Sequence, residues 1–420
     1  MRSSGLFPSR RLARWHLVLP LTALLALLIV TPATERLDLW LYDTIIQQSP
    51  LPPPDNLTLV AIDEKSLERL GRWPWPRQYH ATLINRLDQA GAGTIAFDIL
   101  FTEPSERGAQ DRQLAEAMER HGNVVLPLHI YPTDDEQPLR EFLPIAPLTK
   151  AASALGHVHV ELDDDGIARG FYRREGLGEA VWPSLADAVI QQSGMATQQE
   201  TAASTPANAP FVNVRRNRVR IPFSGRAGRM PSVSYIDVLE GRVPPERLRD
   251  RVVFVGITAA GFGDLLPTPV SGRTAPLSGV EFHANAFSAI AQDRVIYPAP
   301  TWVALLLGLL SVAIIGACFP RWRPLRTLAL AAALTLLPVL VSYGLLRLHS
   351  LWLAPGAPAL TAALAFPLWT TQRLGLLNRF LNRQLHALGR ERRITIGRLE
   401  DRPPAQLLDE LRELLQATEG

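Results

Sequence analysis

Four side chains in the middle of the sequence have the chemistry of a hydrolytic or metal-assisted site. Asp63, Asp98 and Asp264 offer carboxylates, and His283 offers an imidazole that exchanges protons near neutral pH. Such groups act together only if the fold brings them within hydrogen-bond reach of one another. The sequence contains no nucleophile elbow, no zinc-protease helix and no complete calcium loop. We therefore predict no catalytic residue, no metal ligand and no cofactor, and keep a hydrolase or metal-dependent enzyme as the alternative function.

The elements that would position these groups are short apolar strands separated by helical patterns. Residues 57–62, 93–101, 123–130 and 251–258 form near-continuous apolar runs, which are typical of strands buried on both faces of a parallel sheet. Helical stretches between them supply crossover connections. Two further segments, around 156–175 and 211–223, each read as strand, polar turn and strand. The predicted fold is an α/β domain with a mostly parallel sheet and added antiparallel hairpins.

Ligands of open parallel sheets gather beyond the carboxyl ends of the strands. Asp98 and the loop after residue 257 fall at this edge, and the stiff segment RWPWPR (72–77) holds two indole rings in extended geometry. These rings either pack as a rigid strut between two helices or line a ligand pocket. The predicted ligand-binding residues are Trp73, Trp75, Arg77, Asp98, Thr258 and Asp264.

Two other polar groups allow both a structural and a functional interpretation. Asp63 and Glu64 follow the first strand, and we favour a capping role because carboxylates satisfy the free N–H groups at the start of a helix. His157 and His159 alternate along a predicted strand and therefore face the same side. They are either a satisfied pair on a sheet face, which is the more frequent case, or a site that binds a metal or senses pH.

The 420-residue chain has an apolar share of 47%, which is high for a purely soluble protein. Its formal charge of +3 is not gathered into a basic face, so we expect no nucleic-acid partner. The single cysteine, Cys318, excludes an intrachain disulfide. Four apolar stretches are long enough to cross a bilayer, and membrane lipid is an expected partner. The first is either a retained signal anchor, which we favour, or a cleaved signal peptide.

Arginine placement predicts the orientation, since basic residues in short flanking segments stay in the cytoplasm. Arginines are concentrated before residue 15, in the turn at 320–326 and after residue 370, so these segments are predicted to be cytoplasmic. The long stretch after the first apolar run then lies outside the cytoplasm. Tryptophans at the ends of the four stretches fit the aromatic belt of a membrane protein.

Five motifs occur in one order: VAIDEKSLERLGRWPWPR, IAFDILFTEPS, GHVHVELDDDG, VVFVGITAAGFGDLLPTP and GVEFHANAFSAI. This series closely resembles the second class of CHASE extracellular sensor domains, over about residues 36–370. The resemblance implies a sensory input module of a transmembrane receptor, in a bacterial inner membrane and facing the periplasm. It implies neither a particular ligand nor a catalytic residue. The predicted order is cytoplasmic tail (1–14), transmembrane helix (15–33), periplasmic sensor domain (34–299), three transmembrane helices (300–319, 326–346, 351–370) and cytoplasmic helical tail (371–420).

The tail departs from such receptors, because fewer than sixty residues follow the last apolar stretch and no cyclase or kinase domain is among them. It resembles a histidine-kinase phosphoacceptor helix in which Glu400 replaces the phosphorylated histidine, or it is an ordinary charged amphipathic tail. A leucine stripe at three- and four-residue steps predicts a short coiled coil in a homodimer. The stripe residues are Leu374, Leu377, Leu381, Leu385 and Leu388.

We therefore predict a membrane-bound sensor without an output enzyme of its own. An unknown extracytoplasmic ligand would shift a two-state arrangement of helices, and a separate cytoplasmic kinase or cyclase would read that shift.

Overall fold

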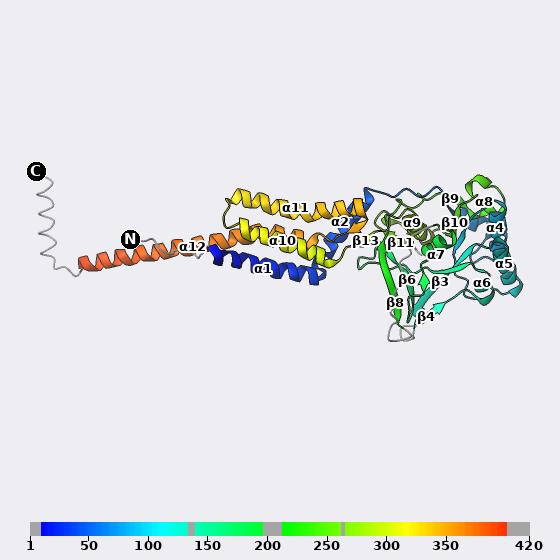
Figure 1. The fold of residues 1–420 in the computed structure, drawn as a ribbon, viewed down its shortest axis with the longest axis horizontal. Helices are drawn as coiled ribbons and strands as arrows, with labels where there is room; N and C mark the ends of the chain where they lie inside the picture. Colours follow the sequence, from blue (N-terminus) through cyan, green and yellow to red (C-terminus); the bar gives the residue numbers. More distant parts are fainter. Residues whose placement is uncertain (1–9, 133–138, 196–211, 262–264, 401–420) are drawn as a thin grey trace, which may run out of the picture. The chain divides into compact units, whose positions relative to one another are not determined.

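The structure is a computed structural model, and it describes residues 10–132, 139–195, 212–261 and 265–400 (Figure 1). The chain divides into two compact units. One unit comprises Ala33–Val303 and Leu340–Ala354, and we call it the sensor unit because it contains the predicted sensor domain. The helical unit comprises Met1–Pro32, Ala304–Val339 and Pro355–Gly420.

The sensor unit is built on a mixed sheet whose centre is parallel. Its strand order is β9-β1-β10-β2-β3, and β3 also pairs with β5 in parallel and with β4 in antiparallel orientation. The four apolar runs of the sequence form β1, β2, β3 and β10, as predicted. The strands are β1 (Leu57–Ile62), β2 (Ile95–Asp98), β3 (Val124–Pro132), β4 (Leu139–Phe142), β5 (Ala154–His157), β9 (Ser232–Ser234) and β10 (Val252–Ile257).

Each central strand is apolar on both faces because helices cover both sides of the sheet. Along β10, Val252 and Phe254 point into one core, whereas Val253 and Val255 point into the other. This alternation follows from the two-residue period of a strand and explains the unbroken apolar runs of the sequence.

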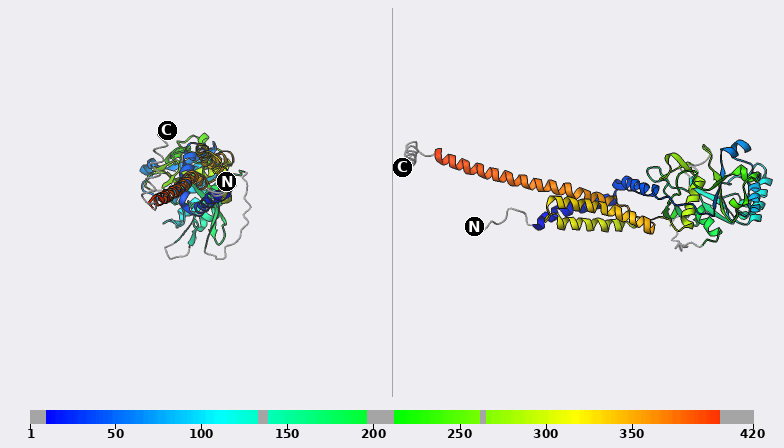
Figure 2. Two further views of the ribbon diagram at one scale, coloured as in Figure 1. Left: turned by 90° about the vertical axis from the view of Figure 1, so that its left-hand side faces the viewer. Right: turned by 90° about the horizontal axis from the view of Figure 1, so that it is seen from above.

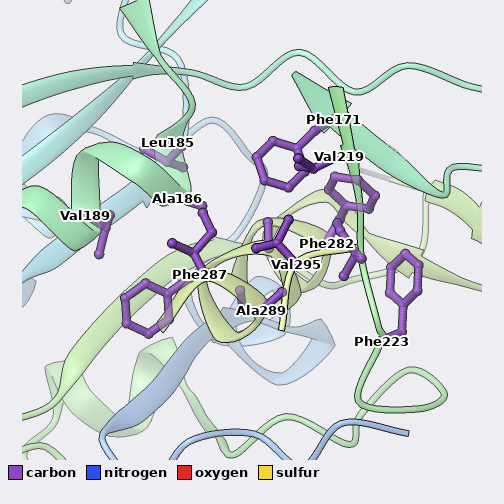
Figure 3. Packing of buried hydrophobic residues seen from close by; sticks show 14 of the residues in the cluster. Phe171, Leu185, Ala186, Val189, Val219, Phe223, Phe282, Phe287, Ala289 and Val295 are labelled. Carbon is purple, nitrogen blue, oxygen red and sulfur yellow. The ribbon is translucent and has the colours of Figure 1, made fainter. Parts of the chain in front are cut away.

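Two groups of helices form these layers. The helices α4, α5, α6 and α8 lie along one side of the sheet (Figure 1), and α3 packs against the same core through Leu67 and Leu70. On the other side, side chains of α7 and α9 interlock with Phe171 and Val219 from a second sheet (Figure 3). The bounds are α3 (Glu64–Leu70), α4 (Arg77–Gln89), α5 (Gly108–His121), α6 (Ala146–Ala151), α7 (Leu185–Gln192), α8 (Tyr235–Leu239) and α9 (Gly279–Ala291).

The second sheet is antiparallel, with the order β7-β6-β8. The prediction of a hairpin at 211–223 is wrong, because this segment contributes one strand that pairs along its length with β6. Asn217 takes up the left-handed backbone at φ 58° without ending that strand, which is why its polar sequence resembled a turn. A further antiparallel pair joins β11 and β12. The bounds are β6 (Gly170–Leu177), β7 (Trp182–Pro183), β8 (Asn213–Arg220), β11 (Leu265–Thr268) and β12 (Gly272–Ser278).

Four elements at the margins of the sensor unit were not predicted. A 3-10 turn (Pro32–Thr34) and the helix α2 (Glu35–Gln47) follow the first apolar helix. The strands β13 (Tyr297–Pro298) and β14 (Leu351–Trp352) form a parallel pair. The predicted fourth apolar helix at 351–370 therefore starts later, at Gly356, because Leu351 and Trp352 pair with β13 and Pro355 precedes the helix.

In the part of the helical unit that the structure describes, four helices share an apolar core. Leu17 and Leu21 of α1 pack with Val312 and Ile315 of α10, and α11 and α12 contribute mainly small side chains such as Ala362. Glycine permits close approach here: a Cβ atom on Gly308 would lie 2.5 Å from the side chain of Leu25. The helices are α1 (Arg10–Val30), α10 (Thr301–Cys318), α11 (Pro324–His349) and α12 (Gly356–Glu400).

Within the described residues, α10 and α11 are long and apolar enough to cross a membrane. A third span results if Trp15–Val30 and Pro32–Gln47, which are bent by 81° relative to each other, are counted as one. The predicted count of four spans is thus not established. Figure 2 shows α12 as one continuous helix that extends well beyond its apolar part. Leu374, Leu381 and Leu385 of the leucine stripe are exposed on α12, whereas the side chains of Leu377 and Leu388 lie outside the described set.

Candidate functional site

The carboxyl ends of the central strands bring Asp98 next to helix α9. In the sheet register Gly256 of β10 stands beside Ala61 of β1 on one side and beside Asp98 of β2 on the other. A Cβ atom on Gly256 would lie 2.6 Å from Val280 and 3.2 Å from the Cβ of Asp98. Glycine is therefore needed here, because any side chain would push α9 away from the strand ends.

Asp98 and His283 are the two members of the acidic and imidazole set that meet. His283 Nε2 of α9 lies 3.9 Å from Asp98 Oδ1. Burial is the main cause that lowers the pKa of His283 to about 3, so this imidazole is neutral at physiological pH. A neutral histidine beside one carboxylate forms neither a nucleophilic triad nor a metal site by itself.

Asp63, the other described member of that set, does not join them. Asp63 caps α3: its Oδ1 accepts hydrogen bonds from the Ser66 backbone N–H at 2.9 Å and from the Ser234 hydroxyl at 2.8 Å. Glu64 accepts a hydrogen bond from the Ala260 N–H at 3.1 Å. Asp264 lies outside the described residues, among which no group of three or more His, Cys, Asp or Glu side chains has the arrangement of a metal site. This arrangement does not favour the hydrolase alternative.

The segment RWPWPR packs mainly as a strut. The Trp75 side chain is 3% exposed, its indole N–H donates to the Gly71 carbonyl at 2.9 Å, and its ring lies 5.0 Å from that of Tyr235. Trp73 is half-buried, with its ring 5.2 Å from Trp75. The Arg77 guanidinium lies 4.5 Å from the centre of the Phe101 ring. These three side chains therefore have protein partners, and a ligand-binding role for them stays a prediction.

Thr258, the remaining predicted ligand residue, continues the strand ladder. Its backbone N–H donates to the Ile62 carbonyl at 3.0 Å, which ties the end of β10 to the end of β1. The side chain is half-buried at the strand-end edge. Thr258 and Asp98 thus both lie at the edge where the sequence placed them.

A buried polar cluster surrounds Glu175 of β6. His157 Nδ1 lies 3.6 Å from Glu175 Oε2, and His159 Nδ1 lies 4.0 Å from Glu175 Oε1. Asn213 donates to the same carboxylate at 2.5 Å, and Arg215 Nε donates at 3.0 Å. Both histidines lie against this carboxylate, but the prediction that they alternate along one strand is wrong, because β5 ends at His157.

Protonation in this cluster is set mainly by burial. Desolvation lowers the pKa of His157 to about 4, although the negative charge of Glu175 opposes the change. The pKa of His159 is lowered for the same reason. Burial would raise the pKa of Glu175, but the hydrogen bonds from Asn213 and Arg215 outweigh this effect, and the pKa lies below its usual value. The cluster therefore holds one carboxylate, one guanidinium and neutral imidazoles.

Sequence reasoning missed a second charged group centred on Arg169. This side chain is 1% exposed and binds three carboxylates. Asp43 of α2 accepts from Nε and Nη2 at 2.7 Å each, while Asp163 and Asp165 accept at 2.7 to 2.9 Å. Only the DDDG turn hinted at this group, because Asp43 is distant in sequence from the other members.

The sensor unit and the apolar helices together describe a membrane-associated protein with an α/β input domain. The family model of the CHASE2 domain matches residues 21–318, and the chain belongs to this family. CHASE2 is a sensor domain family of signalling receptors. A comparison with curated proteins and a comparison with solved structures gave no match.

Proposed function

We propose that this protein is a receptor of the bacterial inner membrane that detects a periplasmic stimulus and relays it to a cytoplasmic signalling partner. In this proposal α12 carries the signal towards the cytoplasm. Four membrane crossings by α1, α10, α11 and the first part of α12 agree with the arginine distribution and with the common apolar core of these helices.

The observation that carries this proposal is that the connections to the apolar helices meet inside the sensor unit. Asp43 of α2, which follows α1, is bound by Arg169. The Ala299 N–H, just before α10, donates to the Trp352 carbonyl, just before α12, at 2.8 Å. The rings of Tyr42 and Trp352 make an edge contact at 5.0 Å.

These contacts, which we call the junction, could transmit a conformational change of the sensor unit to the apolar helices in this proposal. Tyr42 lies in α2, which follows α1, and Trp352 precedes α12. A rearrangement of the sensor unit that displaces Tyr42 relative to Trp352 therefore moves the chain next to α1 relative to the chain next to α12. Signalling needs such an element, whose equilibrium is influenced from both sides. The exposed leucines of α12 then supply the surface through which two copies change their pairing.

Cysteine cross-linking in membranes tests the homodimer and the relay surface. In a Cys318→Ser background, Leu374→Cys, Leu381→Cys and Leu385→Cys are expected to form disulfide-linked dimers readily. Arg379→Cys, which is also exposed on α12, is the matched control and is expected to cross-link weakly. Equal cross-linking at all four positions would mean that the leucine stripe is not a dimer surface.

Two further measurements test the orientation and the partner. Reporter fusions are expected to place residue 100 in the periplasm and both termini in the cytoplasm, and the opposite result would contradict the receptor proposal.

Capture with the tail 371–420 is expected to retain a kinase or cyclase, and alanines at Leu381 and Leu385 are expected to release it. A tail that retains the same proteins with and without these alanines would argue against a specific partner.

A further inference from the structure

The sensor unit contains a cavity of about 950 Å³ that is distinct from the strand-end edge and from the polar cluster around Glu175. One wall is the loop 224–229, another is the proline-rich segment between α2 and β1, and a third is formed by residues 269–275. Gln47, the last residue of α2, completes the lining. A volume of this size accommodates a small organic ligand.

The charge of the lining is positive. Arg226 and Arg229 line the cavity and are exposed, and their side chains form no ion pair with any residue that the structure describes. By contrast, Arg169 and Arg173 elsewhere in the unit are bound by carboxylates. No Asp or Glu stands among the described lining residues. Two guanidinium groups without a counter-ion among the described residues favour an oxyanion, because guanidinium donors match carboxylate and phosphate oxygens.

Helix α9 holds the loop that carries these arginines. The Ser224 N–H donates to Asn285 Oδ1 at 2.7 Å, and the Gly228 N–H donates to Glu281 Oε1 at 2.7 Å.

The remaining walls are apolar and stiff. Pro50, Pro52, Pro53 and Pro269 line the cavity, together with Val270 and Ala275. The Gln47 side-chain amide donates to the Pro269 carbonyl at 2.7 Å, and the Leu51 N–H donates to the Phe223 carbonyl at 3.1 Å. Fixed φ angles and these bonds keep the walls in place before a ligand arrives, which lowers the entropic cost of binding.

We propose that this cavity binds an organic oxyanion, in which a phosphate or carboxylate group is attached to an apolar body. Arg226 and Arg229 pair with the anion, and the proline walls contact the apolar part. The inference rests on the proposed sensor function, and it places the ligand against the end of α2. The same chemistry is offered by a soluble metabolite and by the headgroup region of an anionic lipid.

Thermal unfolding of the full chain in phosphatidylcholine nanodiscs tests the site. Phenyl phosphate and benzoate are expected to raise the unfolding temperature, whereas phenol, which lacks the anion, is expected to leave it unchanged. The double variant Arg226→Ala/Arg229→Ala is expected to bind phenyl phosphate at least about tenfold more weakly, since two charge-assisted contacts are lost. The variant Arg226→Lys/Arg229→Lys is expected to retain part of the affinity.

The matched control is Arg112→Ala/Arg249→Ala, which removes two exposed arginines of the same unit that do not line the cavity. It is expected to respond to phenyl phosphate like the unmodified chain. The proposal is overturned if neither anion stabilises the protein, or if the Arg226/Arg229 variant responds like the control. Stabilisation by phosphatidylglycerol nanodiscs that phenyl phosphate cannot increase further would identify the lipid as the source of the anion.

Ligand binding at the cavity and signal relay through α12 are distinguished by measuring both in one sample. Leu381→Cys cross-linking with and without phenyl phosphate reports the relay, while the unfolding temperature reports the site. Binding that leaves cross-linking unchanged supports the cavity and contradicts the relay. Absence of binding contradicts the cavity alone, because the relay proposal does not specify where its ligand binds.

Discussion

Arg169 and Asp43 form a two-pronged ion pair across 126 residues of sequence, with both nitrogen–oxygen distances at 2.7 Å. The pair joins the helix that follows the first apolar segment to the strand-rich face of the sensor unit. Asp163 and Asp165 surround the same guanidinium, so one buried cation serves three carboxylates. A buried arginine of this kind is stable only while its partners are present.

Removing Arg169 should therefore damage the sensor unit severely. Arg169→Met leaves three carboxylates facing one another, and we expect a loss of about 3–5 kcal/mol in the free energy of unfolding. Asp43→Asn leaves two carboxylates on the arginine and is expected to cost less. Thermal unfolding of the full chain in detergent measures both, with Arg112→Ala as the surface control. An unfolding temperature of Arg169→Met within the range of the control would contradict the assigned role.

Trp75 and Trp73 should differ in their contribution to stability although they are two residues apart. Trp75 is 3% exposed and Trp73 is only half-buried. Trp75→Ala opens a large cavity next to Tyr235, and we expect a cost of about 3–5 kcal/mol. Trp73→Ala is expected to cost clearly less. Similar losses from both substitutions would be inconsistent with the packing of this segment as a strut.

His80 should make the sensor unit sensitive to acid. Its ring is fully buried among aromatic side chains, its Nδ1 lies 2.9 Å from the Tyr235 hydroxyl, and burial lowers its pKa to about 3. In the unfolded state this histidine has a pKa near 6.5, so the folded state binds fewer protons than the unfolded state below that pH. The free energy of unfolding is therefore fully retained above pH 6.5 and decreases as the pH falls towards 3. Between pH 7 and pH 5 the loss from this group is roughly 2 kcal/mol.

Unfolding scans at several pH values check the histidine prediction. The variant His80→Phe keeps an aromatic ring in place and is expected to show a smaller decrease of the unfolding temperature between pH 7 and pH 5. His157 and His283 remain in that variant and preserve part of the decrease, because their pKa values are also lowered, to about 4 and about 3. An unchanged pH profile would show that His80 does not contribute.

Gly308 should be required for the packing of α10 against α1. A side chain at this position meets Leu25 at 2.5 Å, whereas a Cβ on Gly344 of α11 has no neighbouring atom within 4 Å. Gly308→Leu is therefore expected to lower the unfolding temperature, while Gly344→Leu serves as the matched control and should have little effect. If both variants unfold at the same temperature, the close contact between α1 and α10 is not important for stability.

The sequence by itself determined the elements whose signals are local. Unbroken apolar runs predicted the four central strands, because a strand covered by helices on both faces has no polar side. The position of Asp63 before a helix predicted its capping role. The order of motifs also identified the sensor family.

Only the tertiary structure decided which distant residues meet. The polar segment at 211–223 became one strand because β6 supplied a partner along its length, and local turn chemistry could not reveal that partner. Arg169 found Asp43, and Arg226 and Arg229 came to line a cavity beside α2, through contacts between segments far apart in the chain. Hydrogen bonds and ion pairs act over a few ångströms, so their partners are fixed by the folded path of the backbone rather than by sequence spacing.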